Sequence, residues 1–178
     1  MTPADLRLLF DHLYWTRDRL LGAAAVDPAG LTDPSPVTIR DLRATLVHEL
    51  DVEWSWRVRL AGPDPTQFSP DDEELNPADY ADVDAIAARW ATDEAEMRAW
   101  LASLDEAALA GPCHAEASRS HPLWFHLQHL YTHALQQFSD AAAVLTRTGH
   151  SPGEIDFLEF VQDRLDPPAT PVDEPATT

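Results

Sequence analysis

The sequence predicts an all-α protein: a four-helix bundle with a short fifth helix that covers it near the C-terminus. Four long segments carry apolar residues at the three- and four-residue spacing of a helix face, and proline- and glycine-rich connections separate them. Hardly any segment has the alternating pattern of a strand. The chain of 178 residues is long enough for one core. We expect one domain over residues 1–164 and a disordered, proline-rich tail over residues 165–178.

The charge balance disfavours several classes of partner. Asp and Glu number 31 against 12 Lys and Arg, which gives a formal net charge of −19. Such a surface repels a phosphate backbone and an anionic membrane, so neither nucleic-acid nor membrane binding is expected. No window is apolar for long enough to span a bilayer, and we expect a soluble, cytoplasmic protein. The lone Cys113 excludes an internal disulfide, leaving histidine and carboxylate as expected metal ligands.

The first helix is predicted over residues 3–25. Thr2 is suited to the N-cap, Pro3 to the first helical position and Asp5 to the first turn, where the helix dipole favours an acid. Asp27 and Pro28 end the segment. We place His12 at the surface or at its boundary.

The second helix is predicted over residues 38–60, with Thr38 as its cap and Asp41 completing a capping box. Gly62 ends it. His48 lies off the main apolar stripe, which consists of Leu42, Leu46, Leu50, Trp54 and Val58.

The third helix is predicted over residues 83–104, with Asp82 as its cap. Its acids Asp93, Glu94 and Glu96 are placed on the solvent face. The segments 61–81 and 105–120 are rich in proline or small residues and are expected to be irregular.

The fourth helix, predicted over residues 121–149, carries the clearest chemical pattern. His126, His129 and His133 recur at intervals of three and four residues, and Gln137 follows four residues later, so all four share one stripe. A buried stripe lies beside them and consists of Leu123, Leu127, Leu130, Ala134, Phe138, Ala141 and Leu145. A short fifth helix within residues 151–165 is expected to cover one end of the bundle.

The histidine stripe allows two interpretations. Two imidazoles four residues apart on one helix and a third from a neighbour give three ligands to a divalent metal, with a position left for water or a thiolate. Such a metal lowers the pKa of what it binds and generates a nucleophile. Alternatively, the buried histidines and the glutamine simply hydrogen-bond one another.

Three segments, LYWTRDRLL, LVHELDVEWSW and HLYTHALQQ with the following LTRTGHSPGEIDF, resemble the DinB-like family of four-helix-bundle, metal-dependent enzymes. The resemblance covers almost the whole ordered chain. It implies a divalent metal, zinc or nickel, bound by one histidine of the second helix and two histidines four residues apart on the fourth. In some branches it implies a transferase or isomerase that uses a low-molecular-weight thiol.

Carried over to this sequence, the family ligands fall on His48, His133 and Gln137. Glutamine is a weaker ligand for zinc or nickel than imidazole. His129, one turn earlier, could replace it and restore a pair four residues apart. The predicted metal residues are therefore His48, His129, His133 and Gln137.

Two functions follow from this set. The first is a metal-dependent enzyme that acts on a small-molecule substrate, with a thiol as cosubstrate. The alternative is a metal-free bundle that serves as a small-ligand binding or stress-associated interaction module. A homodimer is a third prediction, because one small core need not hold all of Trp54, Trp56, Trp90, Trp100 and Trp124.

Overall fold

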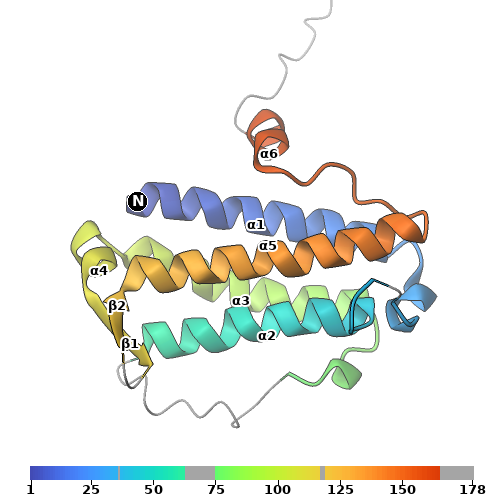
Figure 1. Ribbon diagram of the computed structural model, residues 1–178, viewed down its shortest axis with the longest axis horizontal. Helices are drawn as coiled ribbons and strands as arrows, with labels where there is room; N and C mark the ends of the chain where they lie inside the picture. Colours follow the sequence, from blue (N-terminus) through green and yellow to red (C-terminus); the bar gives the residue numbers. More distant parts are fainter. Residues whose placement is uncertain (36, 63–74, 117–118, 165–178) are drawn as a thin grey trace, which may run out of the picture.

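Four long helices lie side by side in the computed structural model, which describes residues 1–35, 37–62, 75–116 and 119–164. They are α1 (Pro3–Ala24), α2 (Leu42–Ala61), α3 (Val83–Ser103) and α5 (Leu123–Arg147). Figure 1 shows them packed as one bundle, in which α5 contacts both α1 and α2, and α3 contacts the same two helices. The predicted all-α four-helix bundle is confirmed. The predicted disordered tail, residues 165–178, lies outside the described residues.

Two predicted helix starts are confirmed by their caps. The Asp5 backbone N–H donates to Thr2 Oγ1 at 3.2 Å, and the Thr2 backbone N–H donates to Asp5 Oδ2 at 2.8 Å, which completes a capping box before α1. Asp82 caps α3 by accepting from the backbone N–H of Ala85 at 2.9 Å.

The predicted start of α2 is wrong by four residues. Asp41 is itself the N-cap, since its Oδ1 accepts from the backbone N–H of Ala44 at 2.7 Å. The hydroxyl of Thr38 instead donates to the backbone carbonyl of Arg40 at 2.6 Å. That local bond competes with helix formation and holds residues 38–40 outside the helix.

Apolar residues of the four helices form one core, and the predicted stripe of α5 is fully confirmed. The core includes Phe10, Leu46, Ile86, Trp90, Met97, Leu127 and Phe138, each at most 2% exposed. Burying each large side chain stabilises the fold by about 1.5–3 kcal/mol.

Charged residues also lie inside the bundle, which corrects two predictions. On α2 the buried positions include Glu49, Glu53 and Arg57, whereas Val58 of the predicted stripe is 37% exposed. Asp93, placed on the solvent face from the sequence, is 0% exposed. Arg57 donates through Nε to Asp93 Oδ1 at 3.1 Å, so the two opposite charges are buried as an ion pair.

The segment before α5 is more regular than expected. The short helix α4 (Glu106–Ala110) is followed by an antiparallel hairpin of β1 (Pro112–Glu116) and β2 (Arg119–Pro122), with Cys113 opposite His121. Figure 1 shows this hairpin beside the N-terminal end of α5. Strand β2 runs directly into the helix, so the hairpin fixes where α5 begins. Two short 3₁₀ turns, Pro28–Thr32 and Pro77–Asp79, complete the described elements.

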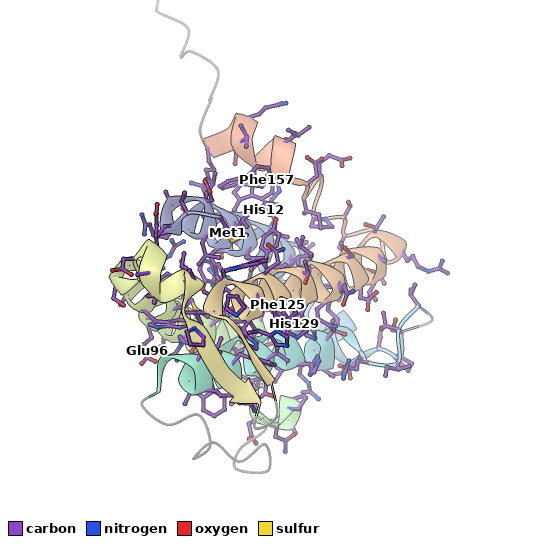
Figure 2. All side chains as sticks on the ribbon, turned by 60° about the vertical axis from the view of Figure 1, so that its left-hand side comes forward. Met1, His12, Glu96, Phe125, His129 and Phe157 are labelled. Carbon is purple, nitrogen blue, oxygen red and sulfur yellow. The ribbon has the colours of Figure 1, made fainter. Side chains whose placement is uncertain are left out.

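The last helix, α6 (Phe157–Arg164), packs along the side of α1 rather than over a bundle end, which corrects the predicted placement. Phe160 is buried there, while Leu158 remains 70% exposed. Figure 2 shows Phe157 beside His12. His12, predicted near the surface, is only 2% exposed because α6 covers it, and its Nε2 lies 3.1 Å from the Ile155 carbonyl oxygen. Within the described ranges, every helix is too short or too polar to span a lipid bilayer.

Candidate functional site

Three histidines meet between α2 and α5. The His48 ring, from α2, lies with its centroid 5.5 Å from that of His133 on α5, and the His129 ring lies 6.1 Å from His133. Residues later in α2 contact residues earlier in α5, so the two helices run antiparallel and bring these positions together. We call His48, His129 and His133 the histidine group.

A buried carboxyl group holds the central ring of this group. Glu49 Oε2 lies 2.7 Å from His133 Nδ1, and Glu49 is only 1% exposed. In the tautomer that donates Nδ1–H to Glu49, the lone pair is on Nε2, the ring nitrogen that Glu49 does not contact. In that tautomer the contact fixes the orientation of the ring and leaves Nε2 able to act as a ligand or base.

Burial sets the charge of both partners. Burial lowers the pKa of His133 to about 4, and repulsion from His48, His129 and Arg40 adds to the effect. Burial also raises the pKa of Glu49 well above its usual range, with Glu53 as a further cause. At neutral pH His133 is therefore an uncharged imidazole, which is the form that binds metals.

A second buried carboxyl group lies one helical turn from Glu49. Glu53 Oε1 accepts from the Tyr14 hydroxyl at 2.5 Å, and Oε2 accepts from Trp90 Nε1 at 2.9 Å. Burial raises the pKa of Glu53 to about 7 even though both donors favour the carboxylate. Three helices thus supply a polar layer that supports the helix face carrying Glu49.

Aromatic rings also adjoin the histidine group. The Trp56 ring centroid lies 5.4 Å from that of His129 and 5.8 Å from that of His126. His126, on the same predicted stripe, is 3% exposed and packs beside Trp56 instead of joining the group. Figure 2 shows Phe125, which is 47% exposed, and His129 at the hairpin end of the bundle.

Residues 10–138, which span most of α1 through the histidine-bearing part of α5, match the sequence profile of the DinB superfamily. The chain belongs to the DinB superfamily. No curated protein sequence matches it. The match includes the three histidines and Gln137 and ends before α6, so the helix that covers α1 lies outside the matched region.

Within this DinB bundle, the fourth predicted metal residue, Gln137, lies one helical turn after His133 on α5. The Gln137 side chain is half-buried and makes no hydrogen bond to a described residue. Among the residues that the structure describes, no three His, Cys, Asp or Glu side chains converge as metal ligands. The rings of the histidine group are neighbours without forming such a ligand set.

Sequence reasoning missed Glu49 and Glu53, although a signal was present. Both continue the helical spacing of Leu42 and Leu46, which indicates the core side of α2. An acid on a buried face beside a histidine is a recognisable sign of a carboxyl–imidazole pair.

Proposed function

We propose that this DinB-superfamily protein is a divalent-metal-dependent enzyme whose zinc or nickel ion is held by His48, His129 and His133. The observation that carries the proposal is the contact of 2.7 Å between Glu49 and His133 Nδ1. Histidine ligands of metals commonly donate their other ring N–H to a carboxylate, which orients the ring and strengthens the ligand. A buried acid in that position beside two further imidazoles supports a metal site.

The donor set suits such an ion in its chemistry. Uncharged imidazoles are preferred ligands of zinc and nickel, and three of them leave a coordination position open. A bound divalent metal lowers the pKa of the water or thiol that occupies this position. The His48 and His129 rings would have to turn toward His133 Nε2, since no three ligand side chains converge in the described residues.

The reaction class rests on the family resemblance. It favours a transfer or isomerisation with a low-molecular-weight thiol as cosubstrate and a small molecule as substrate. The half-buried Trp56 beside His129 offers an apolar wall for such a substrate.

Metal analysis of untagged protein tests the proposal. After incubation with zinc or nickel and dialysis, about one ion per chain should remain in the wild type, as expected for a single three-histidine site. His133→Ala should lose it, whereas His150→Ala, altered beyond the end of α5, should retain it. Metal content near zero in the wild type would refute the proposal.

Two observations favour a second candidate, a metal-free bundle that binds a small ligand or acts as a stress-associated interaction module. Gln137 stands where the family resemblance places a histidine ligand, and no three His, Cys, Asp or Glu side chains among the described residues converge as metal ligands. In that case zinc and nickel leave the melting temperature of the wild type unchanged, and His133→Ala only modestly alters stability. A metal-dependent rise in melting temperature would exclude this candidate.

A further inference from the structure

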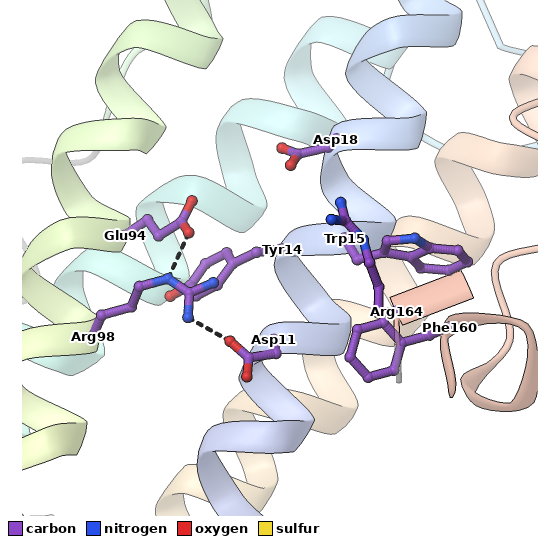
Figure 3. Close-up of a pocket in the computed structure, with 8 residues that line it drawn as sticks. All are labelled: Asp11, Tyr14, Trp15, Asp18, Glu94, Arg98, Phe160 and Arg164. Carbon is purple, nitrogen blue, oxygen red and sulfur yellow. Dashed lines mark hydrogen bonds and ion pairs between the residues drawn. The ribbon is translucent and has the colours of Figure 1, made fainter. Parts of the chain in front are cut away.

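A second candidate site is a cavity of about 260 Å³ between α1, α3 and α6 (Figure 3). None of the histidine group lines it. Its walls are Asp11, Tyr14, Trp15, Asp18, Glu94, Arg98, Phe160 and Arg164. The volume is slightly below the roughly 300–1,000 Å³ of sites for drug-sized molecules, so it suits a small ligand.

The interior of the cavity is aromatic. Tyr14, Trp15 and Phe160 are each at most 5% exposed, and the Trp15 and Phe160 ring centroids lie 5.8 Å apart. Trp15 Nε1 donates to Asp163 Oδ2 at 2.7 Å and ties α6 to α1. The Tyr14 hydroxyl is already bonded to Glu53, so its ring is what a ligand would contact. These rings provide an apolar floor.

Most of the charges around the cavity already have partners. Arg98 donates to Glu94 Oε1 at 2.6 Å and also to Asp11, and it lies over the Tyr14 ring. The other Glu94 oxygen accepts from Arg17 at 2.6 Å. Arg98 and Glu94 therefore form part of the wall and are not available to a ligand.

Two side chains of opposite charge, Asp18 and Arg164, have hydrogen-bonding atoms that no described residue occupies. Arg17 bonds Asp18 only through Oδ1, and Asp18 Oδ2 accepts no hydrogen bond from a described residue. Arg164 makes no hydrogen bond to the described residues, and among them its ion-pair partner is Asp163, whose Oδ2 lies 3.7 Å from Arg164 Nε. Figure 3 shows the Arg164 side chain extending from α6 toward the side of the cavity where Asp18 lies.

We propose that this cavity binds a small zwitterion with an ammonium and a carboxylate on an apolar body, which is the chemistry of a free apolar amino acid. Asp18 Oδ2 accepts from the ammonium, Arg164 pairs with the carboxylate, and the three rings contact the side chain. An anion alone would meet Asp11, Asp18 and a protein of net charge −19. An amine alone would leave the Arg164 guanidinium without a hydrogen-bond partner among the described residues. A zwitterion satisfies both groups and links α6 to α1.

Calorimetric titration of the full chain tests the proposal with phenylalanine, and with leucine in case the phenylalanine ring is too large for the cavity. Phenethylamine lacks the carboxylate and hydrocinnamate lacks the ammonium. We expect at least one amino acid to bind roughly tenfold tighter than either singly charged analogue, since each charge-assisted hydrogen bond is lost in one of them.

Variants of the two exposed residues test which side chain binds each charged group of the ligand. Arg164→Gln should remove the advantage over phenethylamine, and Asp18→Asn the advantage over hydrocinnamate. Their side chains are 60% and 59% exposed, so both variants should fold. Arg147→Gln, at the end of α5, is the matched control and should bind as the wild type does. Absence of binding by both amino acids, or equal binding by all variants, would overturn the proposal.

Discussion

Replacing Glu53 with glutamine should remove a pH dependence of stability that the buried carboxyl group creates. Glu53 is 4% exposed, and burial raises its pKa from 4.5 to about 7. The folded protein therefore binds this proton more tightly than the unfolded chain does. The stabilisation is fully present below the unfolded pKa and is lost as the pH rises through about 7.

The magnitude follows from the gap between the two pKa values. At about 1.36 kcal/mol per pKa unit, the gap corresponds to on the order of 3 kcal/mol over the whole titration. Roughly 2 kcal/mol of this stabilisation is lost between about pH 5.5 and pH 8, the interval in which Glu53 of the folded protein ionises while Glu53 of the unfolded chain is already ionised. The wild type should lose this much more stability across that interval than Glu53→Gln.

Urea denaturation at the two pH values measures the difference directly. Glu49 and Asp93 also have raised pKa values, and Glu53 is one cause of the shift of Glu49, so the comparison measures Glu53 together with its effect on Glu49. Glu154→Gln, in an exposed loop position, is the matched control and should keep the wild-type dependence. An unchanged pH dependence in Glu53→Gln would show that Glu53 is already ionised in the folded protein.

Two further predictions concern the histidine group and the core. Glu49→Gln should weaken zinc binding by about 10–100-fold in a chelator competition, because the amide orients His133 without the charge of a carboxylate; unchanged affinity would separate Glu49 from the site. Leu127→Ala should lower the free energy of unfolding by about 2–5 kcal/mol, since Leu127 is 0% exposed. Leu158→Ala, at a position 70% exposed, should change it by less than about 0.5 kcal/mol in the same denaturation assay.

The fold was predictable because its signals are local. The apolar stripe of α5 repeats at helical spacing, and all of its members are buried. Thr2 and Asp82 cap their helices through bonds that reach only three residues along the chain. The hairpin before α5 lacked such a signal, since its short strands neither alternate clearly nor carry a typical turn pair.

The buried charges were not predictable because their partners are distant in sequence. Asp93 enters the core with Arg57, which lies 36 positions away, and Glu49 contacts His133 across 84 positions. Composition alone places such acids on the surface. His129 and His133 were singled out because imidazoles at helical spacing are rare enough to be noticed, whereas His48 was assigned from the family resemblance. The carboxyl group that orients His133 required the packing of α2 against α5.

Glu49 and Asp93 are both buried acids, but their surroundings assign them different roles. Asp93 is the buried partner of the Arg57 guanidinium, which also contacts the exposed Glu96 at 2.6 Å, so Asp93→Leu should destabilise the fold by about 1.5–3 kcal/mol through loss of the buried charge-assisted hydrogen bond. Among the described residues no Lys or Arg pairs with Glu49, and its partner His133 is half-buried and uncharged.

Glu49→Leu therefore exchanges a desolvated carboxyl group for an apolar side chain at the loss of one hydrogen bond, which water can replace. Its free energy of unfolding should change by no more than about 1 kcal/mol, as measured by urea denaturation alongside Asp93→Leu. An equally large loss in both variants would make Glu49 a structural residue. If the fold tolerates Glu49→Leu, stability does not explain why an acid is buried at this position. The orientation of His133 by Glu49 then explains it.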